Sequence, residues 1–138
     1  MKTRYFSFLL SFLYGSLVFA HGEDKLGPNG GMIRMPGAFH TELVQVSPEQ
    51  FKIFLLDMNF ENPTVHDSSV EVLLEKAKSE KKILCNPSEN HFVCKLSHDW
   101  KLGKLKSLSV LAKRENQKGG FAVYELPFKS HSSTKHQH

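Results

Sequence analysis

The sequence predicts a single small domain, an antiparallel β-sandwich. Short runs of alternating or β-branched residues recur about every ten residues, which is the spacing of strands in such a sandwich. The chain has 138 residues, too few for two domains that each bury an adequate core. With 40% hydrophobic and 23% charged residues, it has the composition of a globular protein. The predicted strands are Phe39–Val46, Phe51–Met58, Val70–Lys76, Lys81–Cys85, His91–Leu96, Leu105–Lys113 and Gly120–Phe128.

Turn-forming residues separate these runs in order along the chain. The turns are Ser47-Pro48, Asn59 to Pro63, Asn86-Pro87, Gly103 and Gly119-Gly120. The pattern of Val70–Glu80 fits a strand and a helix about equally, and we expect a strand. Trp100 is expected to anchor the core or its rim, because large aromatic side chains dominate small cores.

Residues 1–20 have the features of a signal peptide. A short basic start precedes an uncharged run from Tyr5 to Ala20, and small residues occupy the two positions that a signal peptidase reads. The run is short for a membrane span, which needs about 20 apolar residues, although an uncleaved anchor is the alternative. We therefore expect a periplasmic or secreted protein that begins at His21, with no stable membrane insertion after cleavage.

Two further segments flank the predicted sandwich, which covers residues 38–128. Residues 21–37 are rich in Gly and predict an extended N-terminal segment with turns, and residues 129–138 lack apolar side chains and predict a disordered tail. Without the two basic residues of the leader, 16 basic residues stand against 14 acidic ones. Such a balance does not favour a nucleic-acid partner, which selects a strongly basic face.

The two cysteines, Cys85 and Cys94, are predicted to form a structural disulfide. They lie in two apolar runs joined by turn-forming residues, so a hairpin would place the sulfurs opposite each other. An exported chain with two cysteines most simply pairs them. A thiolate pair for metal or redox chemistry is the alternative, but the CxxC spacing is absent and the neighbours are apolar.

Histidine is the unusual feature of the composition, because all eight residues follow the leader and imidazole is a common transition-metal ligand. His21 would carry both a free α-amine and an imidazole, two nitrogens that can chelate one Cu(II). The tail histidines predict weak and unselective metal binding; they are His131, His136 and His138. The remaining histidines outside the next segment are expected at the surface; they are His66, His91 and His98.

A candidate metal site lies in the segment from Met32 to Glu42. His40 and Glu42 are two residues apart on a predicted strand, so their side chains share one face. They can ligate one ion, or the carboxylate can orient the imidazole from outside the ligand shell. Met32 and Met35 just upstream offer thioethers, which favour Cu(I). A hydrogen-bonded structural histidine is the alternative.

The segment HGEDKLGPNGGMIRMPGAFHTELV resembles small periplasmic domains linked to heavy-metal handling. Similar segments occur near the start of adaptor subunits of heavy-metal efflux systems and in stand-alone exported proteins. Gly30-Gly31 match the family's turn and His40 and Glu42 its HxE pair, whereas Asn29 stands where the pattern often has His. The stretch FLLDMNFENPTV resembles a strand-turn piece of the same modules. The resemblance implies an immunoglobulin-like sandwich and a role in copper or zinc tolerance.

The function predicted from these observations is non-enzymatic binding of a transition metal, copper or alternatively zinc. His40 is the expected central ligand, with His21 and Met35 or Glu42 completing the set, and the metal would be buffered or passed to an efflux or inner-membrane complex. The alternative is a metal-free interaction module, which would have His40 and Glu42 occupied by hydrogen bonds and an apolar patch exposed elsewhere. A copper oxidase with an N-terminal histidine brace is a third possibility. Phosphate-loop, dinucleotide and hydrolase motifs are absent.

Overall fold

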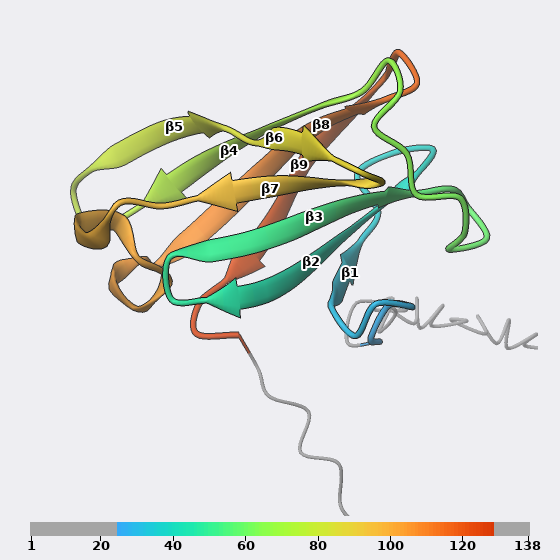
Figure 1. Ribbon diagram of the computed structural model, residues 1–138. Coiled ribbons are helices and arrows are strands. Elements are labelled where there is room, and N and C mark those ends of the chain that lie inside the picture. The colour runs from blue at the N-terminus through green and yellow to red at the C-terminus, as the bar shows by residue number, and fades with distance from the viewer. Residues whose placement is uncertain (1–24, 129–138) are drawn as a thin grey trace, which may run out of the picture.

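The computed structural model describes residues 25–128, which form two antiparallel sheets packed face to face (Figure 1). Sheet A has the strand order β1-β2-β3-β7-β6 and sheet B the order β5-β4-β8-β9. The strands are β1 (Met32–Arg34), β2 (His40–Ser47), β3 (Gln50–Leu56), β4 (Ser69–Glu75), β5 (Glu80–Leu84), β6 (Asn86–Ser88), β7 (His91–Lys95), β8 (Ser107–Arg114) and β9 (Gln117–Glu125). The predicted all-β sandwich is confirmed.

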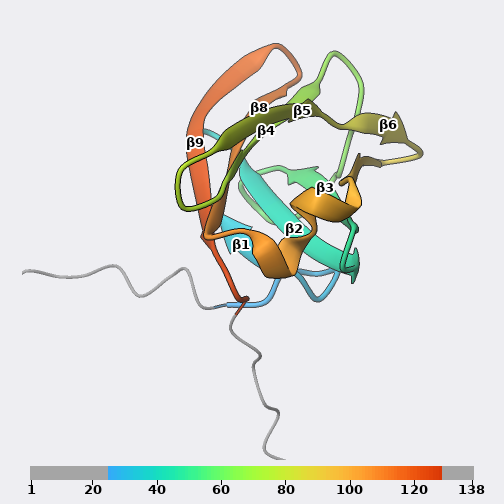
Figure 2. The same ribbon diagram turned by 90° about the vertical axis from the view of Figure 1, so that its left-hand side faces the viewer.

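The chain builds the sandwich from hairpins that alternate between the sheets. The hairpins β2–β3 and β6–β7 lie in sheet A, and β4–β5 and β8–β9 lie in sheet B. Two short 3-10 turns, η2 (His98–Trp100) and η3 (Leu102–Lys104), fill the crossing from β7 to β8 and close one end of the molecule (Figure 2). Each of the seven predicted runs contains a strand, and Val70–Glu80 is confirmed as non-helical.

Two short strands were not predicted from the sequence. The sequence indicated seven strands, and the described residues contain nine. Both β1 and β6 have only three residues, and they lie at the two edges of sheet A. Strand β6 contains Pro87, which the sequence pattern assigned to a turn. A proline is tolerated at a sheet edge because its missing N–H leaves no ladder bond unmade there.

Alternating side chains from both sheets form the core between them. Among the largest fully buried residues are Phe39, Phe51, Phe92 and Tyr124. The Tyr124 hydroxyl of β9 donates to the Thr41 carbonyl of β2 at 3.1 Å and lies 2.7 Å from the Thr41 hydroxyl. This buried polar contact fixes the position of sheet B relative to sheet A, because both partners are satisfied only in one alignment.

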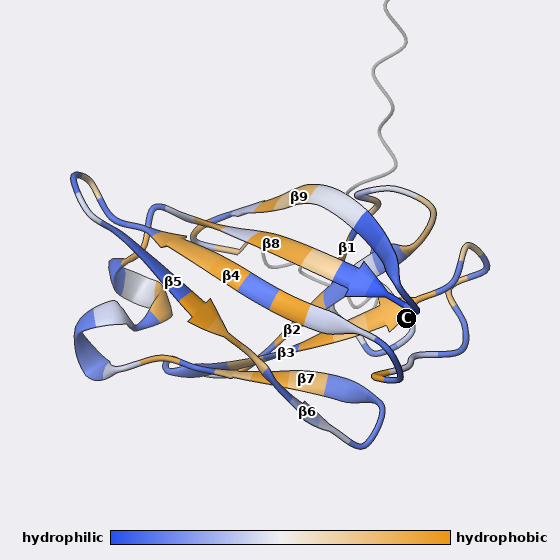
Figure 3. Ribbon diagram, turned by 90° about the horizontal axis from the view of Figure 1, so that it is seen from above, coloured by the Kyte–Doolittle hydropathy of each residue, from blue (hydrophilic) through white to orange (hydrophobic). Residues whose placement is uncertain are grey.

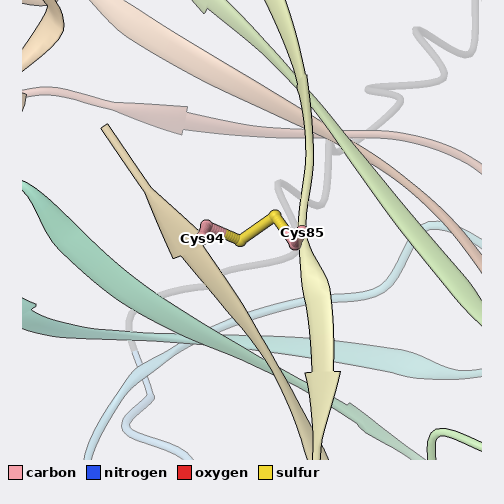
Figure 4. The surroundings of a disulfide bond; sticks show 2 residues. All are labelled: Cys85 and Cys94. Atoms are coloured by element: carbon pink, nitrogen blue, oxygen red, sulfur yellow. A yellow bond between two sulfur atoms is a disulfide. The ribbon is translucent and has the colours of Figure 1, made fainter. Parts of the chain in front are cut away.

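The predicted disulfide joins Cys85 and Cys94, and the predicted hairpin forms around it (Figure 4). Cys85 lies where the chain passes from β5 in sheet B to β6 in sheet A, and Cys94 lies on β7. The register of β6 with β7, in which Asn86 faces Val93, places the two cysteines opposite each other with Cα atoms 4.5 Å apart. Both side chains are buried. A disulfide of this kind fits an exported protein.

No helix among residues 25–128 is long and apolar enough to cross a membrane. The predicted signal peptide, the N-terminal His21 and the predicted disordered tail with His131, His136 and His138 all lie outside the described residues.

Candidate functional site

The Gly-rich N-terminal segment folds into a tight turn against the outer face of sheet A. The Gly27 amide donates to the Gly31 carbonyl at 2.8 Å, and the Gly30 amide donates to the Gly27 carbonyl at 3.0 Å. Gly30 has φ +77°, a conformation that L side chains rarely adopt. A Cβ on Gly27 would collide with the carboxyl group of Glu42, so the turn lies directly on that side chain.

Glu42 is the acceptor that holds this turn in place. It is 0% exposed, and its two carboxylate oxygens accept three hydrogen bonds. Oε1 accepts from the amides of Asn29 and Gly31 at 2.8 and 2.9 Å, and Oε2 accepts from the Asn29 side-chain amide at 2.9 Å. A buried carboxylate needs such donors because desolvation otherwise disfavours its charge. The geometry assigns Glu42 a structural role at the turn.

His40 is also held by the protein, but only at one ring nitrogen. Its Nδ1 lies 3.0 Å from the Asp57 carbonyl oxygen, and its ring stacks on Phe60 with centroids 4.1 Å apart. A carbonyl oxygen can only accept, so Nδ1 carries a proton and Nε2 is the ring nitrogen left for another contact. The side chain is 6% exposed. This orientation by a backbone carbonyl is a common arrangement for a metal-ligating histidine.

The loop after β3 positions these partners of His40. The Asp57 carboxylate accepts hydrogen bonds from the amides of Asn59 and Glu61, each at 2.9 Å, and from the Asn62 side chain at 2.8 Å. The hydrogen bonds from the Glu61 amide and the Asn62 side chain are the main causes that lower the pKa of the Asp57 carboxyl; desolvation opposes them, and the Asn59 amide adds a smaller lowering effect. The loop is therefore fixed by its own hydrogen bonds and presents Phe60, at φ 61°, to the imidazole ring.

The two methionines that were predicted as ligands, Met35 and Met32, lie in different surroundings from each other. Met35 directly follows the last residue of β1, and its exposed side chain lines a cleft beside β9 with Phe121 and Val123. Met32 instead packs against the core between the sheets. Residues 25–128 contain no group of three or more His, Cys, Asp or Glu side chains that could hold a metal ion. Among the predicted ligands, only His40 and Met35 keep a donor atom that the described residues leave open.

His91 was expected at the surface, but it is buried. Its side chain is only 8% exposed and packs against Phe54, with ring centroids 5.1 Å apart. Phe54 belongs to a second, smaller apolar cluster on the outer face of sheet A, together with Ile33 and Leu56. Burial is the main cause that lowers the pKa of His91, with the nearby charge of Lys52 adding to it. His66 and His98 are exposed, as predicted.

The outer face of sheet B carries an exposed group of apolar side chains that the sequence analysis missed. We call this group the apolar face; its members are Leu73, Leu84, Leu111, Phe121 and Val123. Leu84 is 69% exposed, Phe121 63% and Val123 47%, whereas Leu73 and Leu111 are half-buried. A signal was present in the sequence, because β9 is apolar at consecutive positions from Phe121 to Tyr124 and therefore on both of its faces.

A shallow cleft of about 220 Å³ continues this face toward sheet A. It lies between the end of β1 and the middle of β9, and its lining residues are Arg34, Met35, Pro36, Phe121, Ala122 and Val123. Across it, the Arg34 Nε donates to the Val123 carbonyl at 2.9 Å, and the Gly120 amide donates to the Pro36 carbonyl at 2.8 Å. These contacts occupy backbone groups on the outer edge of β9.

No family model, curated protein or solved structure matches the chain. The resemblance to heavy-metal-handling domains therefore rests on the motif alone.

Proposed function

We propose that this protein is an interaction module of the cell envelope whose docking surface is the apolar face of sheet B. The observation that carries the proposal is the exposure of Phe121, Val123 and Leu84 on one side of one sheet. Contiguous apolar groups of this kind on a folded domain are typical of protein interaction sites. Burial of Phe121 and Val123 by a partner would remove unfavourable contact with water.

The state of the predicted metal site also supports an interaction module. Glu42 is fully occupied by hydrogen bonds from the N-terminal turn, and His40 is held by Asp57 and Phe60. The full occupation of the Glu42 carboxylate, the hydrogen bond at one nitrogen of His40 and the apolar face elsewhere are features expected of a metal-free module.

The strand order supports an immunoglobulin-like type for the proposed module. In such sandwiches, strands A, B, E and D form one sheet, while C, F and G form the other with C′ added beside C. Assigning β2 to A and continuing along the chain with β3 as B gives A-B-E-D for β2-β3-β7-β6. The same assignment gives C′-C-F-G for β5-β4-β8-β9.

Site-specific photo-crosslinking in the cells that make the protein tests the docking surface. A photoreactive amino acid at position 121 is expected to crosslink to a protein partner, because Phe121 lies at the centre of β9 on the apolar face. The control is the same group at position 58, since Met58 is 51% exposed in the loop after β3, away from this face. Absence of a crosslinked product at position 121, or equal products at both positions, would contradict the proposal.

A second candidate function, transition-metal binding through His40, is favoured by the orientation of its ring. The hydrogen bond to the Asp57 carbonyl occupies Nδ1 and leaves Nε2 as the metal-binding atom, and the exposed thioether of Met35 is a further predicted ligand. Copper or zinc bound there would need further ligands, for which His21 is the proposed source. The protein would then buffer the metal or deliver it to an efflux or inner-membrane partner in the periplasm.

Titration of the exported protein with Cu(II), Cu(I) and Zn(II) against chelators tests this second function. Binding tighter than about 1 μM is expected only for a built site, and His40→Ala should weaken it at least tenfold, a loss of about 1.4 kcal/mol. His98→Ala is the matched control, because His98 is exposed at the other end of the molecule. Weak binding that both variants share would contradict a site at His40.

A further inference from the structure

We propose that the partner on the apolar face is a second copy of this chain. The two copies would pack sheet B against sheet B, related by a two-fold axis that lies in the interface and runs across the strands. The inference rests on the proposed interaction function and adds the identity of the partner. A two-fold interface uses the same patch on both subunits, so the patch must be complementary to itself.

The strand register arranges the outer face of sheet B in rows that cross the four strands. Side chains directly opposite each other on neighbouring strands point to the same face, so the register defines these rows. One central row contains Leu84, Glu71, Leu111 and Phe121, and the next contains Lys82, Leu73, Ser109 and Val123. The only charges in these two rows, Glu71 and Lys82, form an ion pair at 3.9 Å. The middle of the face is therefore apolar and locally neutral.

The two rows that border this middle carry opposite charges. On one side, Glu80, Glu75, Ser107 and Glu125 form a row, and we call its three carboxylates the acidic row. On the other side, Lys113 of β8 faces Lys118 of β9, and we call these two the basic pair. Within residues 25–128, neither the acidic row nor the basic pair takes part in an ion pair. Figure 3 shows the outer face of sheet B, with hydrophilic residues at the arrowhead of β8; Lys113 belongs to this end of the strand.

This order of charges selects one mode of self-packing. A two-fold axis across the strands reverses the strand direction but lays each strand on its own copy, so Glu125 of each copy faces Lys118 of the other on β9 and the two apolar middles meet. An axis along the strands would place the acidic row on itself, and Glu75 and Glu80 already face each other within one copy. Like charges brought together in an interface are unfavourable, whereas opposite charges fix its register. The reversed arrangement is the complementary one.

The edges of sheet B are less suited to pairing than its face. Arg34 and Pro36 occupy the Val123 carbonyl and the Gly120 amide on the edge of β9. The other edge strand, β5, carries Lys81 and Lys82, and lysines on an edge oppose strand addition. A second copy therefore joins through the face and leaves the edges of the two sheets separate.

Analytical ultracentrifugation of the exported full chain tests the dimer, with substitutions confined to β9. Under the reversed packing, β9 faces β9 of the partner, so Lys118 of each copy approaches Glu125 of the other. Both side chains are exposed, and a substitution at either leaves the core unchanged. We expect a dimer at about 100 μM, and Phe121→Ser, Lys118→Glu or Glu125→Lys alone should each weaken dimerisation at least tenfold. The exposed Met58→Ser is the matched control and should not change it.

The double charge exchange Lys118→Glu with Glu125→Lys is the decisive variant. It restores opposite charges across a reversed two-fold interface, so its dissociation constant should return to within about threefold of the original value. Failure of the double variant to recover, or a dimer that Phe121→Ser leaves intact, would overturn the proposed packing. A monomeric chain at the highest concentration would also overturn it. If position 121 still crosslinks to a different protein in cells, the interaction function stands and only the identity of the partner is wrong.

Discussion

Replacing Glu42 by alanine is expected to lower the free energy of unfolding by about 3 kcal/mol or more, because three N–H donors lose their acceptor together. The Gly31 amide makes a buried hydrogen bond to Glu42, so removal of the carboxylate leaves this N–H unsatisfied for as long as the turn stays in place. The N-terminal turn would detach from sheet A and expose the side of the sheet on which Gly27 lies. Urea denaturation at neutral pH measures the loss.

Two comparisons make this result specific to the turn. Asp99→Ala removes a carboxylate whose ion pair with Lys104 is solvent-exposed, so the free energy of unfolding should change by less than about 1 kcal/mol. Glu42→Gln retains an acceptor oxygen and should cost less than alanine, although its amide group faces donors. If Glu42→Ala proved as mild as Asp99→Ala but weakened copper binding, Glu42 would be a ligand and its structural role would be wrong.

The fold followed from the sequence because local and global signals agree in this chain. In β2, Leu43 enters the core while Val44 faces outward, as alternation predicts. Pro48 marks the turn between β2 and β3. The cysteines were placed correctly since a short hairpin fixes its own register. Strands β1 and β6 were missed because three residues are too few to show a period, and their pairing depends on neighbours elsewhere in the chain.

The candidate site was predicted only in part, because its chemistry depends on contacts between distant residues. The sequence showed that His40 and Glu42 share a face of β2, and the apolar neighbours of that face confirm it. It could not show that Asn29, 13 residues before Glu42, donates twice to its carboxylate. Nor could it show that the Asp57 carbonyl fixes the proton of His40. Both contacts arise from loops whose paths alternation does not describe.

The apolar face also could not be predicted from the local sequence pattern, because it depends on how the strands pair. Phe121 and Val123 read as ordinary strand residues in sequence, since either face of β9 can be the buried one. Only the register of β9 with β8 shows that Ala122 and Tyr124 fill the core and that Phe121 and Val123 face outward. The register also places Glu125 and Lys118 on either side of them. The self-complementary pattern is therefore a property of the folded sheet.

Removing the disulfide with Cys85→Ala and Cys94→Ala together is expected to lower the free energy of unfolding by roughly 2–3 kcal/mol, the value for closing a loop of about ten residues. The double variant avoids leaving a free thiol in the core. Urea denaturation of the oxidised protein, of the protein with a reductant and of the double variant measures the difference. The reduced protein and the double variant should agree to within about 1 kcal/mol, since each lacks the same link.

The position of the disulfide predicts which strands lose stability when it is removed. Cys85 joins sheet B to sheet A directly after Leu84, so it restrains β5 at the edge of the apolar face. Hydrogen exchange of the double variant should therefore increase first in β5 and β6, while β8 and β9 stay protected by their long ladder. A uniform increase across both sheets would show instead that the link acts only on the unfolded chain. Increased exchange confined to β5 and β6 would mean that the disulfide also maintains the order of the surface on which we expect a partner to bind.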